Sequence, residues 1–377
     1  MSLRVGFNRL FTRYPLTGMG RYAVGLIRSI RALFPEVECV SLRGSGLLEN
    51  SVPLGVRKDM RTAIWELAAL PLAARRAKVD VLHCLYWACP LFPRVSTVVT
   101  IPDTVPMLPL PGFEGYRQGL KSRMYYPLLS AASRRAQAVI AFSTAAAHDT
   151  AGVLGIPCDK FVITPIPPED RFRPVEHPAL LEGVTRKHGI DRPFVLSMAS
   201  GFDYRRNTGA LVRAFGWLRE QRGDDLILVI AGDLRALERP HCPDPRESLA
   251  QAGLTEGVDV RFPGFIDDED LPALYSAATL HACPSLYEGF GLTALESMAC
   301  GTPVVASDIP TFREVLGDAA LLADPHDHEA LGKAMADVLD DKEWAQELAT
   351  RGLARVRELS WAKAARATVA AYERVRG

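Results

Sequence analysis

Two glutamates and a glycine-rich loop are the residues most suited to chemistry on a phosphorylated ligand. The stretch PSLYEGFGLTALESMACGTPVVASD, residues 284–308, follows an expected strand, and its loop holds Gly289 and Gly291 before a helix that starts near Leu292. Glycines let a ligand approach the backbone closely, and a helix start offers unpaired N–H groups and the positive end of the helix dipole. The pattern predicts an anion site, for which a diphosphate is the natural ligand.

Glu288 and Glu296 flank this expected phosphate site. Glu288 lies in the loop, and Glu296 lies on the helix eight positions later. Glu288 therefore faces the group attached beyond the phosphates, while Glu296 can reach the opposite side of the phosphates. Carboxylates accept hydrogen bonds from paired hydroxyl groups, so a sugar and a ribose are apt partners. A glycine-rich loop alone is more often a tight turn, and the prediction depends on the whole stretch.

A second basic element, SGFDYRRN at residues 200–207, directly follows another expected strand. It brings Arg205 and Arg206 to a helix start, where the dipole disfavours cations. That placement favours a ligand role over two solvated arginines. A guanidinium can grip a phosphate with two hydrogen bonds, and a cation here would neutralise charge on a departing nucleotide.

The elements that must position these residues alternate between strands and helices along the chain. Short apolar runs predict twelve strands: Val5–Phe7, Val37–Ser41, Val79–His83, Thr97–Ile101, Ala138–Phe142, Phe161–Thr164, Phe194–Ala199, Asp225–Ala231, Val258–Phe262, Ala278–Cys283, Thr302–Ala306 and Ala319–Ala323. Helix-period segments lie between them, and this alternation predicts doubly wound parallel sheets.

Two helices illustrate the expected pattern of burial. Tyr22–Phe34 places Val24, Leu26, Ile27, Ile30 and Leu33 mainly along one stripe. The helix after the strand at 194–199 carries Leu211, Ala214, Phe215 and Leu218 at a spacing that marks a buried face. A last helix around Trp361–Arg376 follows Ser360 as its expected N-cap. Five prolines at residues 164–178 predict the linker between two domains.

Residues 284–308 closely resemble the signature of the retaining GT-B glycosyltransferases with the Glu-x7-Glu motif, the mannosyltransferase-like glycosyl transferases group 1. The resemblance implies an α/β GT-B fold of two Rossmann-like, doubly wound parallel-sheet domains with an interdomain cleft. The acceptor-binding domain would span 1–170, joined by the C-terminal helix at 361–377, and the nucleotide-sugar-binding domain would span 175–360. The resemblance is strong over about residues 194–361 and patchy over 1–165.

The same resemblance implies a role for each residue of the two motifs. Glu288 would contact the donor sugar at the reacting centre, and Glu296 would bind the ribose hydroxyls. Arg206 stands where the family has a lysine for the diphosphate, and Arg205 precedes it. The backbone that would hold sugar and diphosphate is that of Gly289, Phe290, Gly291, Leu292 and Thr293.

The segment RFPGFIDDEDLPALYSAA, residues 261–278, resembles the family's segment beside the nucleotide base. Phe265 and Ile266 are expected to form the wall of that base site. The acidic run 267–270 could suggest a metal, but capping of the next helix is the favoured interpretation.

The N-terminal half resembles the family more weakly. TGMGRY, residues 17–22, looks like the glycine loop that lines the cleft beneath the donor, which makes Gly18, Gly20 and Arg21 candidates. TIPDTVPML, residues 100–108, matches a segment that usually reads His-Asp. Asp103 remains as a catalytic candidate, whereas Pro102 replaces the histidine and removes the basis for any role borrowed from it. His83 is interpreted as a core or rim histidine.

The resemblance implies a glycosyltransferase that moves a hexosyl or deoxyhexosyl group, with retention and without a metal. Its co-substrate would be a GDP- or UDP-linked sugar, with no other cofactor. The acceptor would be a saccharide, lipid-linked or small-molecule hydroxyl in polysaccharide, glycolipid or glycoside biosynthesis. Two rivals stay open, namely a catalytically silent GT-B partner subunit and a nucleotide-sugar epimerase of the same fold.

Composition limits the partners and the compartment. Residues 1–175 hold 22 basic and 12 acidic residues, a net of +10, so the remainder holds 44−22 = 22 basic and 44−12 = 32 acidic residues, a net of −10. This asymmetry fits either complementary faces of two domains or contact with an anionic membrane surface; no nucleic-acid partner is expected.

Seven cysteines without CxxC spacing fit a reducing cytoplasm. The expected location is cytoplasmic, with peripheral contact at the inner membrane face left open, because neither a signal peptide nor an apolar run of ~18 residues is seen.

Overall fold

Two parallel sheets organise the chain. The computed structural model describes residues 2–8, 18–42, 65–87, 89–107, 120–199, 201–223, 225–239 and 242–376, except for the side chains of Pro106 and of residues 120–125. Contacts divide the chain into a first unit (Met1–Leu108, Arg117–Ile166 and Ser360–Gly377) and a second unit that contains Pro167–Leu359. The segment Pro109–Tyr116 is also assigned to the second unit but lies outside the described residues.

The first unit is built on a six-stranded parallel sheet with the order β2-β1-β3-β4-β5-β6. Its strands are β1 (Leu3–Asn8), β2 (Val37–Leu42), β3 (Val81–Cys84), β4 (Ser96–Thr100), β5 (Ala138–Ala141) and β6 (Phe161–Ile163). Val5 of β1 pairs with Cys39 on one side and with Val81 on the other. The helices are α1 (Gly18–Leu33), α4 (Leu70–Arg76), α6 (Leu120–Arg134), α7 (Thr144–Leu154) and α15 (Trp361–Val375), with short helical turns at Trp65–Ala69, Val105–Met107 and Cys158–Lys160.

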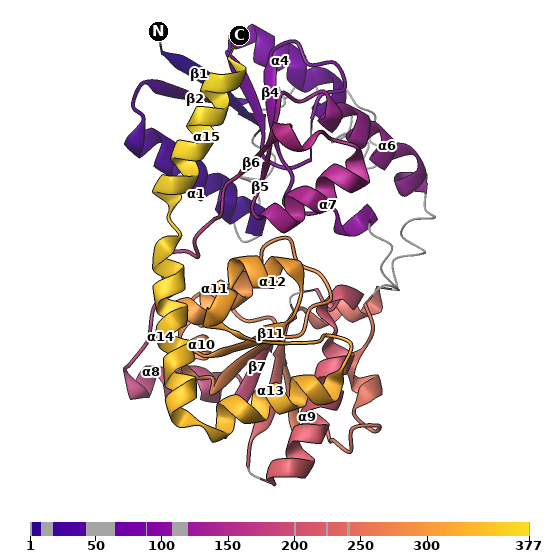
Figure 1. The fold of residues 1–377 in the computed structure, drawn as a ribbon, viewed down its shortest axis with the longest axis vertical. Coiled ribbons are helices and arrows are strands. Elements are labelled where there is room, and N and C mark those ends of the chain that lie inside the picture. The colour runs from indigo at the N-terminus through magenta and orange to yellow at the C-terminus, as the bar shows by residue number, and fades with distance from the viewer. Residues whose placement is uncertain are drawn as a thin grey trace. The chain divides into compact units, whose positions relative to one another are not determined.

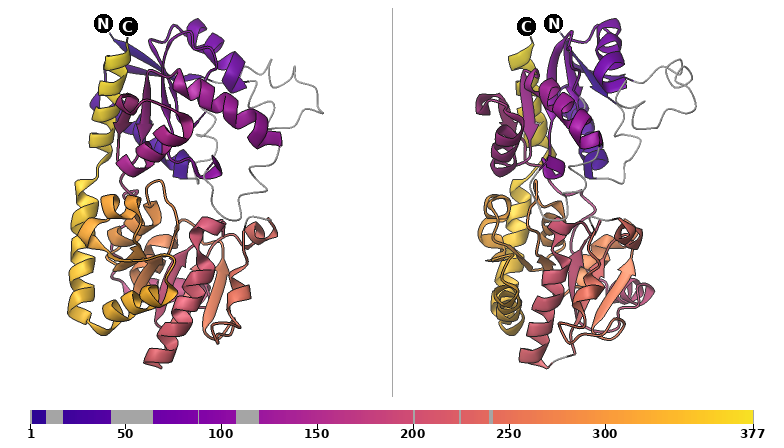
Figure 2. Two further views of the ribbon diagram at one scale, coloured as in Figure 1. Left: turned by 45° about the vertical axis from the view of Figure 1, so that its right-hand side comes forward. Right: turned by 90° about the vertical axis from the view of Figure 1, so that its right-hand side faces the viewer.

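The second unit repeats this plan with the strand order β12-β11-β10-β7-β8-β9. Its strands are β7 (Phe194–Met198), β8 (Ile227–Ala231), β9 (Val260–Gly264), β10 (Leu280–Cys283), β11 (Val304–Ser307) and β12 (Leu321–Ala323). Its helices are α8 (Pro178–Lys187), α9 (Thr208–Arg222), α10 (Leu271–Ala277), α11 (Leu292–Ala299), α12 (Pro310–Val315), α13 (His328–Asp340) and α14 (Lys342–Glu358). Short helical turns occur at Tyr204–Arg206, Leu234–Glu238, Pro245–Ser248 and Gly317–Ala319. Within each unit, helices cover both faces of the sheet (Figures 1 and 2).

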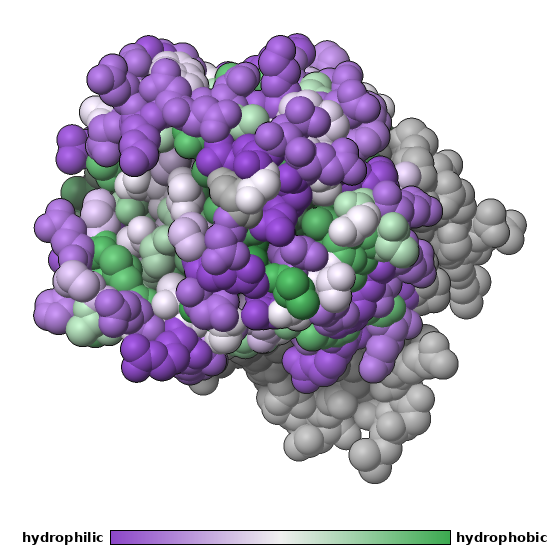
Figure 3. Space-filling view, turned by 90° about the horizontal axis from the view of Figure 1, so that it is seen from below, coloured by the Kyte–Doolittle hydropathy of each residue, from purple (hydrophilic) through white to green (hydrophobic). Residues whose placement is uncertain are grey.

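On the face of the second unit that Figure 3 displays, hydrophilic residues predominate and hydrophobic residues show as areas bordered by them. Over the described residues, no helix combines the length and the apolar character needed to cross a membrane.

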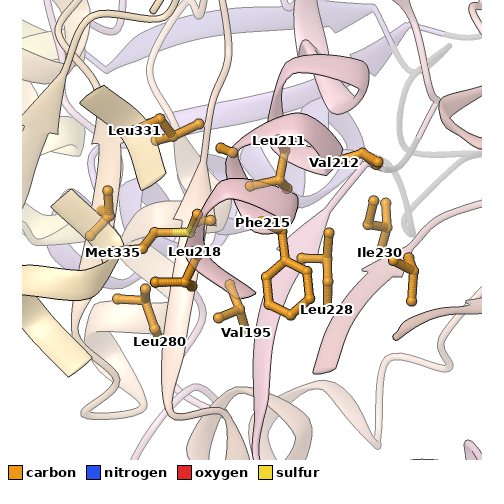
Figure 4. Packing of buried hydrophobic residues seen from close by; sticks show 14 of the residues in the cluster. Val195, Leu211, Val212, Phe215, Leu218, Leu228, Ile230, Leu280, Leu331 and Met335 are labelled. Carbon is orange, nitrogen blue, oxygen red and sulfur yellow. The ribbon is translucent and has the colours of Figure 1, made fainter. Parts of the chain in front are cut away.

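The core of the second unit follows from the alternation of side chains along its strands. Ile227 and Val229 of β8 belong to a cluster beneath α10, while Leu228 and Ile230 belong to a cluster beneath α9 and α13. Successive residues of a strand point to opposite faces, so a strand buried on both faces must be apolar throughout. Figure 4 shows the second cluster, in which Leu211, Phe215 and Leu218 of α9 point toward Val195, Leu228 and Leu280. Burying each such side chain stabilises the fold by roughly 1.5–3 kcal/mol.

The terminal helix α15 is part of the first unit and packs against α1 (Figure 1). Gly25 of α1 lies so close to Trp361 that a Cβ at Gly25 would overlap the indole ring. Farther along α15, the Tyr372 hydroxyl lies 2.6 Å from His83 Nδ1, and His83 Nε2 lies 2.8 Å from Thr100 Oγ1. His83 is therefore a core histidine, as expected, and burial lowers its pKa to about 3.

Each of the twelve expected strands overlaps an observed one, and Ser360 caps α15 by accepting the N–H of Lys363. The expected stripe of the first helix was partly wrong, because Val24 and Leu33 are 47% and 42% exposed. The buried face of α1 is formed by Tyr22, Ala23, Leu26 and Ile30 together with Gly20. Tyr22 belongs to this buried face, and its hydroxyl lies 3.1 Å from Thr100 Oγ1.

Candidate functional site

The strand order of the second unit changes direction between β7 and β10, because the chain extends the sheet from β7 to β8 and β9 and then returns to β10. In doubly wound sheets, ligands bind beyond the carboxyl ends of the strands at such a crossover point. The loop that holds Arg205 and Arg206 follows β7, and the loop that holds Glu288 follows β10. The two motifs identified in the sequence therefore meet at one edge of one sheet.

An ion-pair cluster joins the two loops around Glu288. Arg205 Nη1 donates to Glu288 Oε2 at 3.0 Å, and Arg206 Nη1 donates to Oε1. Ser285 Oγ also donates to Oε1, at 2.9 Å. On its other side, Arg205 Nε lies 3.0 Å from Asp203 Oδ1. The cluster thus holds two guanidinium and two carboxylate groups, so its formal charges balance.

Glu288 is 7% exposed. Two opposed effects act on the pKa of its carboxyl group. Burial acts to raise the pKa of Glu288, but the charges of Arg206 and Arg205 and the Ser285 hydroxyl outweigh it, so the pKa lies below its usual value of 4.5. A carboxylate that accepts several hydrogen bonds in its charged form stays ionised at neutral pH.

Asn207 fixes the position of the arginine loop. Its backbone is left-handed, with φ 54°, and it directly precedes α9. Asn207 Nδ2 donates to the carbonyl oxygens of Pro284, at 3.1 Å, and Pro325, at 2.8 Å. Asparagine is among the few residues that tolerate this backbone region. One amide therefore connects the loops that follow β7, β10 and β12.

The glycine loop and the start of α11 form the expected anion site. Gly291, at φ 92°, is the N-cap of α11, and no side chain caps that helix start. A Cβ at Gly291 would lie 2.5 Å from Phe312 Cε1 of α12, so only glycine fits there. Thr311 Oγ1, also on α12, donates to the carbonyl oxygen of Glu288 at 2.7 Å. Phe312 and Thr311 of α12 thereby hold the glycine loop in place.

The remaining backbone candidates lie around that helix start. Gly289 and Phe290 are buried, whereas Leu292 and Thr293 in the first turn of α11 are partly exposed. First-turn N–H groups have no partner within their own helix, so this turn retains the donors that bind anions.

Glu296 lies on α11 behind the glycine loop and is 6% exposed. Its Oε2 accepts the hydroxyl of Tyr275 at 3.2 Å. The Tyr275 ring meets His281 edge-on at 5.3 Å. Burial, followed by the charge of Arg206, lowers the pKa of His281 to about 3, so this histidine is neutral at physiological pH.

The two residues expected at the base wall differ in exposure. Phe265 is 61% exposed, whereas Ile266 is 4% exposed and packs into the cluster beneath α10. Phe265 thus presents its ring to the surface, while Ile266 can offer a ligand little beyond its backbone.

The acidic run 267–270 does not cap α10, contrary to expectation. Asp270 is the N-cap residue but makes no capping hydrogen bond. Its carboxylate instead binds Lys187 Nζ at 2.7 Å and His188 Nε2 at 2.8 Å. Asp268 accepts from Arg171 at 3.0 Å. Lys187 and Arg171, which come from the segment before β7, offer the carboxylates stronger, charge-assisted hydrogen bonds than a helix N–H.

In the first unit the expected glycine loop is helical. Gly18, Gly20 and Arg21 lie in the first turn of α1, four residues earlier than the helix was expected to begin. Gly18 is exposed and Arg21 is partly exposed. Asp103 lies after β4, where its Oδ1 accepts the N–H of Val105 at 3.2 Å, and the neighbouring Pro102 is buried. Asp103 therefore shapes the turn that follows the strand.

Sequence reasoning missed four residues that hold the site together. Asn207 carried a readable signal, because asparagine before a helix suits a left-handed position. Ser285 lies only three residues before Glu288, but its type alone did not indicate the contact. Thr311 and Tyr275 carried no signal, since only the fold brings them to the two glutamates. Within the described ranges, no three His, Cys, Asp or Glu side chains are arranged to hold a metal ion.

The sequence of the chain is similar to those of known glycosyltransferases. Residues 184–355 match the family model described as glycosyl transferases group 1, and residues 16–167 match the one described as glycosyltransferase family 4. The O-antigen chain mannosyltransferase B of Escherichia coli is 28% identical, over 96% of this chain and 97% of that protein. The serotype-specific mannosyltransferase WbdA of E. coli is 29% identical over 74% of this chain, which spans 35% of that relative.

A solved structure shows the same fold over the whole length. HepE of Anabaena, in complex with UDP and glucose, superposes with a TM-score of 0.72 at 17% identity, covering 99% of this chain and 100% of that one. The two halves of the chain thus match glycosyltransferase family models, group 1 in the second half and family 4 in the first, on a fold of the GT-B type.

Proposed function

We propose that this protein transfers a sugar from a nucleoside diphosphate to a hydroxyl acceptor, with retention of anomeric configuration and without a metal ion. The observation that carries the proposal is the pairing of Arg205 and Arg206 with Glu288, in the loop that leads into the uncapped start of α11. Preorganised cations and N–H dipoles stabilise charge that develops on a leaving group. A diphosphate leaving group develops negative charge as its bond to the sugar breaks, so it requires this stabilisation.

The proposed reaction takes place on one face of the sugar. The bond between the anomeric carbon and the diphosphate oxygen breaks, and the bond to the acceptor oxygen forms on the same face. The acceptor proton passes to an oxygen of the leaving diphosphate. Arg206, Arg205 and the α11 N-terminus stabilise the negative charge of the diphosphate, while Glu288 orients the sugar and stabilises positive charge at its ring.

The environment of Glu288 supports this route over a covalent glycosyl-enzyme intermediate. Its carboxylate accepts hydrogen bonds from Arg205, Arg206 and Ser285, and those contacts hold its pKa low. A carboxylate engaged by three donors is a weak nucleophile, because attack on carbon would require it to give up those charge-assisted bonds.

The relatives support a proposal for the donor and the pathway. Because an O-antigen chain mannosyltransferase aligns over nearly the whole chain, we propose a mannosyl group as the transferred sugar, linked to GDP or UDP, and a saccharide or lipid-linked acceptor in polysaccharide biosynthesis. Glu296 would bind the ribose, and Phe265 would lie beside the base. The acceptor would bind in the first unit, where Gly18, Gly20 and Arg21 would lie beneath the donor and Asp103 would be the catalytic candidate.

The test begins with binding and ends with product analysis. Wild-type protein is screened by thermal shift against GDP, UDP, ADP and CDP, because a ligand that binds the native state raises its Tm by mass action. GDP-mannose and the sugar donors of any other hit are then incubated with mannosyl saccharides, and the product linkage is assigned by NMR. An α product from the α-linked donor supports retention; a β product, or no stabilisation by any nucleotide, contradicts the proposal.

A further inference from the structure

Tyr275 supports the carboxylate that would bind the nucleotide ribose. Its hydroxyl donates to Glu296 Oε2 at 3.2 Å, and both side chains are buried, Tyr275 completely. The hydrogen bond joins α10 to α11, which are separate elements of the second unit. The orientation of Glu296 is thus set from outside its own helix.

The Tyr275 ring is itself held on several sides. Phe172 meets it edge-on at 6.0 Å, and His281 meets it edge-on at 5.3 Å. Thr302 Oγ1 donates to its backbone carbonyl at 2.6 Å. Burial raises the pKa of Tyr275 well above its usual value, so the phenol keeps its proton at physiological pH and remains a donor. A ring packed in this way can aim its hydroxyl in only one direction.

We propose that Tyr275 is a positioning residue for nucleotide binding, which holds the Glu296 carboxylate in the orientation that pairs with the two ribose hydroxyls. The inference rests on the proposed function, because it requires a nucleoside diphosphate in the site. A carboxylate pairs with two adjacent hydroxyls only when its plane is fixed, and a supporting hydrogen bond from a rigid side chain provides that fixation.

The test compares Tyr275→Phe with wild type by calorimetric titration of three kinds of probe. These are GDP and UDP, their 2′,3′-dideoxy analogues, and inorganic pyrophosphate. We expect Tyr275→Phe to weaken the better-bound of GDP and UDP about tenfold, at the upper end of what a single hydrogen bond usually contributes. Affinity for the dideoxy analogue and for pyrophosphate should stay within twofold, because neither carries the ribose hydroxyls.

Two further variants separate positioning from general support of the fold. Tyr372→Phe removes another fully buried tyrosine hydroxyl, which contacts His83 in the first unit, and should leave all these affinities unchanged. In a Glu296→Gln background, adding Tyr275→Phe should cause little further loss, because residues that act through one another are not additive.

Other results would overturn the inference. Equal losses of affinity for the ribose and dideoxy nucleotides, or a loss of affinity for pyrophosphate, would show that Tyr275 only stabilises the glycine loop before α11. An unchanged affinity for GDP and UDP would show that the hydroxyl does not act on binding at all. Wild-type protein that binds neither nucleotide would contradict the proposed function itself, and that outcome is visible before any variant is compared.

Discussion

The carbonyl oxygen of Arg205 accepts the backbone N–H of Leu286 at 2.7 Å. This hydrogen bond joins the loop after β7 to the loop after β10, so the arginines and Glu288 keep a fixed register even though more than 80 residues separate them in the chain. The side-chain ion pairs then form between groups that the backbone has already brought together. Substitutions in either loop should therefore change binding and catalysis without disrupting the sheet.

Replacing Glu288 with glutamine should nearly abolish transfer while nucleotide binding persists. Glutamine keeps the shape of the side chain but loses its charge, so it cannot stabilise a positive sugar ring. Arg205 and Arg206 remain to bind phosphate. Turnover with the identified donor and Kd for GDP and UDP are measured side by side. Ser285→Ala serves as the control, since it removes one hydrogen bond and keeps the Glu288 charge; near-normal turnover in Glu288→Gln would refute the assignment.

Replacing Arg206 with alanine should weaken nucleoside diphosphate binding by roughly 1.5–3 kcal/mol, the usual effect of losing a hydrogen bond to a charged group. Turnover should fall with it. Arg213→Ala is the matched control, because Arg213 lies on α9 and contacts Ser248 instead of Glu288. Wild-type activity should persist in excess chelator, and its loss there would indicate a metal. An unchanged affinity of Arg206→Ala for nucleoside diphosphate would show that Arg206 does not contact the diphosphate.

Replacing Asp203 with asparagine should strengthen diphosphate binding. Asp203 competes with an incoming anion for Arg205, whose Nε lies 3.0 Å from its carboxylate. Removing one partly exposed negative charge should favour the anion by about 1 kcal/mol or less, and the gain should shrink in high salt. Titration with GDP, UDP and pyrophosphate measures it. Asp233→Asn, which alters a pair with Arg235 on an exposed turn, should change nothing; weaker binding in Asp203→Asn would contradict the competition.

Replacing His83 with glutamine should make stability less dependent on pH. The pKa of His83 is about 3 in the folded protein against 6.5 in its ordinary state, so the unfolded chain binds the proton first. The stability that comes from the neutral ring is complete above pH 6.5 and is lost as the pH falls toward 3, with a slope of at most about 1.4 kcal/mol per pH unit. Urea unfolding at pH 7, 6 and 5 measures the slope.

The control for that experiment is the exposed His148. His148→Gln should keep the wild-type slope, whereas His83→Gln should reduce it, with His281 still contributing the remainder. Equal slopes in wild type and His83→Gln would mean that the ring is protonated in the fold.

The first unit should associate with anionic membranes, as its net positive charge suggests. Phe92 is 67% exposed with the Arg135 guanidinium 4.9 Å from its ring centroid, and Leu128 of α6 is 40% exposed. Each basic residue near an anionic surface adds about 1 kcal/mol. Flotation should recover the protein with phosphatidylglycerol vesicles and not with phosphatidylcholine ones, and Phe92→Ser should reduce recovery. Val258→Ser, at an exposed position of the second unit, is the control; equal recovery with both lipids would exclude the electrostatic contact.

The sequence predicted the sheet architecture well because buried parallel strands have a strong local signature. Continuous apolar runs such as Ile227–Ala231 can only be covered on both faces. The glycine loop was predictable for a similar reason, since the left-handed backbone of Gly291 and its contact with Phe312 require that residue.

The failures arose where distant contacts decide a local choice. On the buried face of α1, Tyr22 contacts Thr100 from another part of the chain. The role of the acidic run depends on Arg171, Lys187 and His188. Local pattern identifies a residue as helix-forming or as charged. It cannot identify a partner that the fold brings from another part of the chain.

The return of α15 to the first unit has a consequence for synthesis on the ribosome. Two contacts of the first unit are made by residues 360–376. Trp361 packs against Gly25, and the Tyr372 hydroxyl contacts His83. Translation at roughly 5–20 residues per second therefore leaves the nascent first unit without this helix for about 10–40 s, while Pro167–Leu359 is being made. During that interval the face of α1 that α15 later covers is open to chaperones, and the later unit can finish folding before the earlier one.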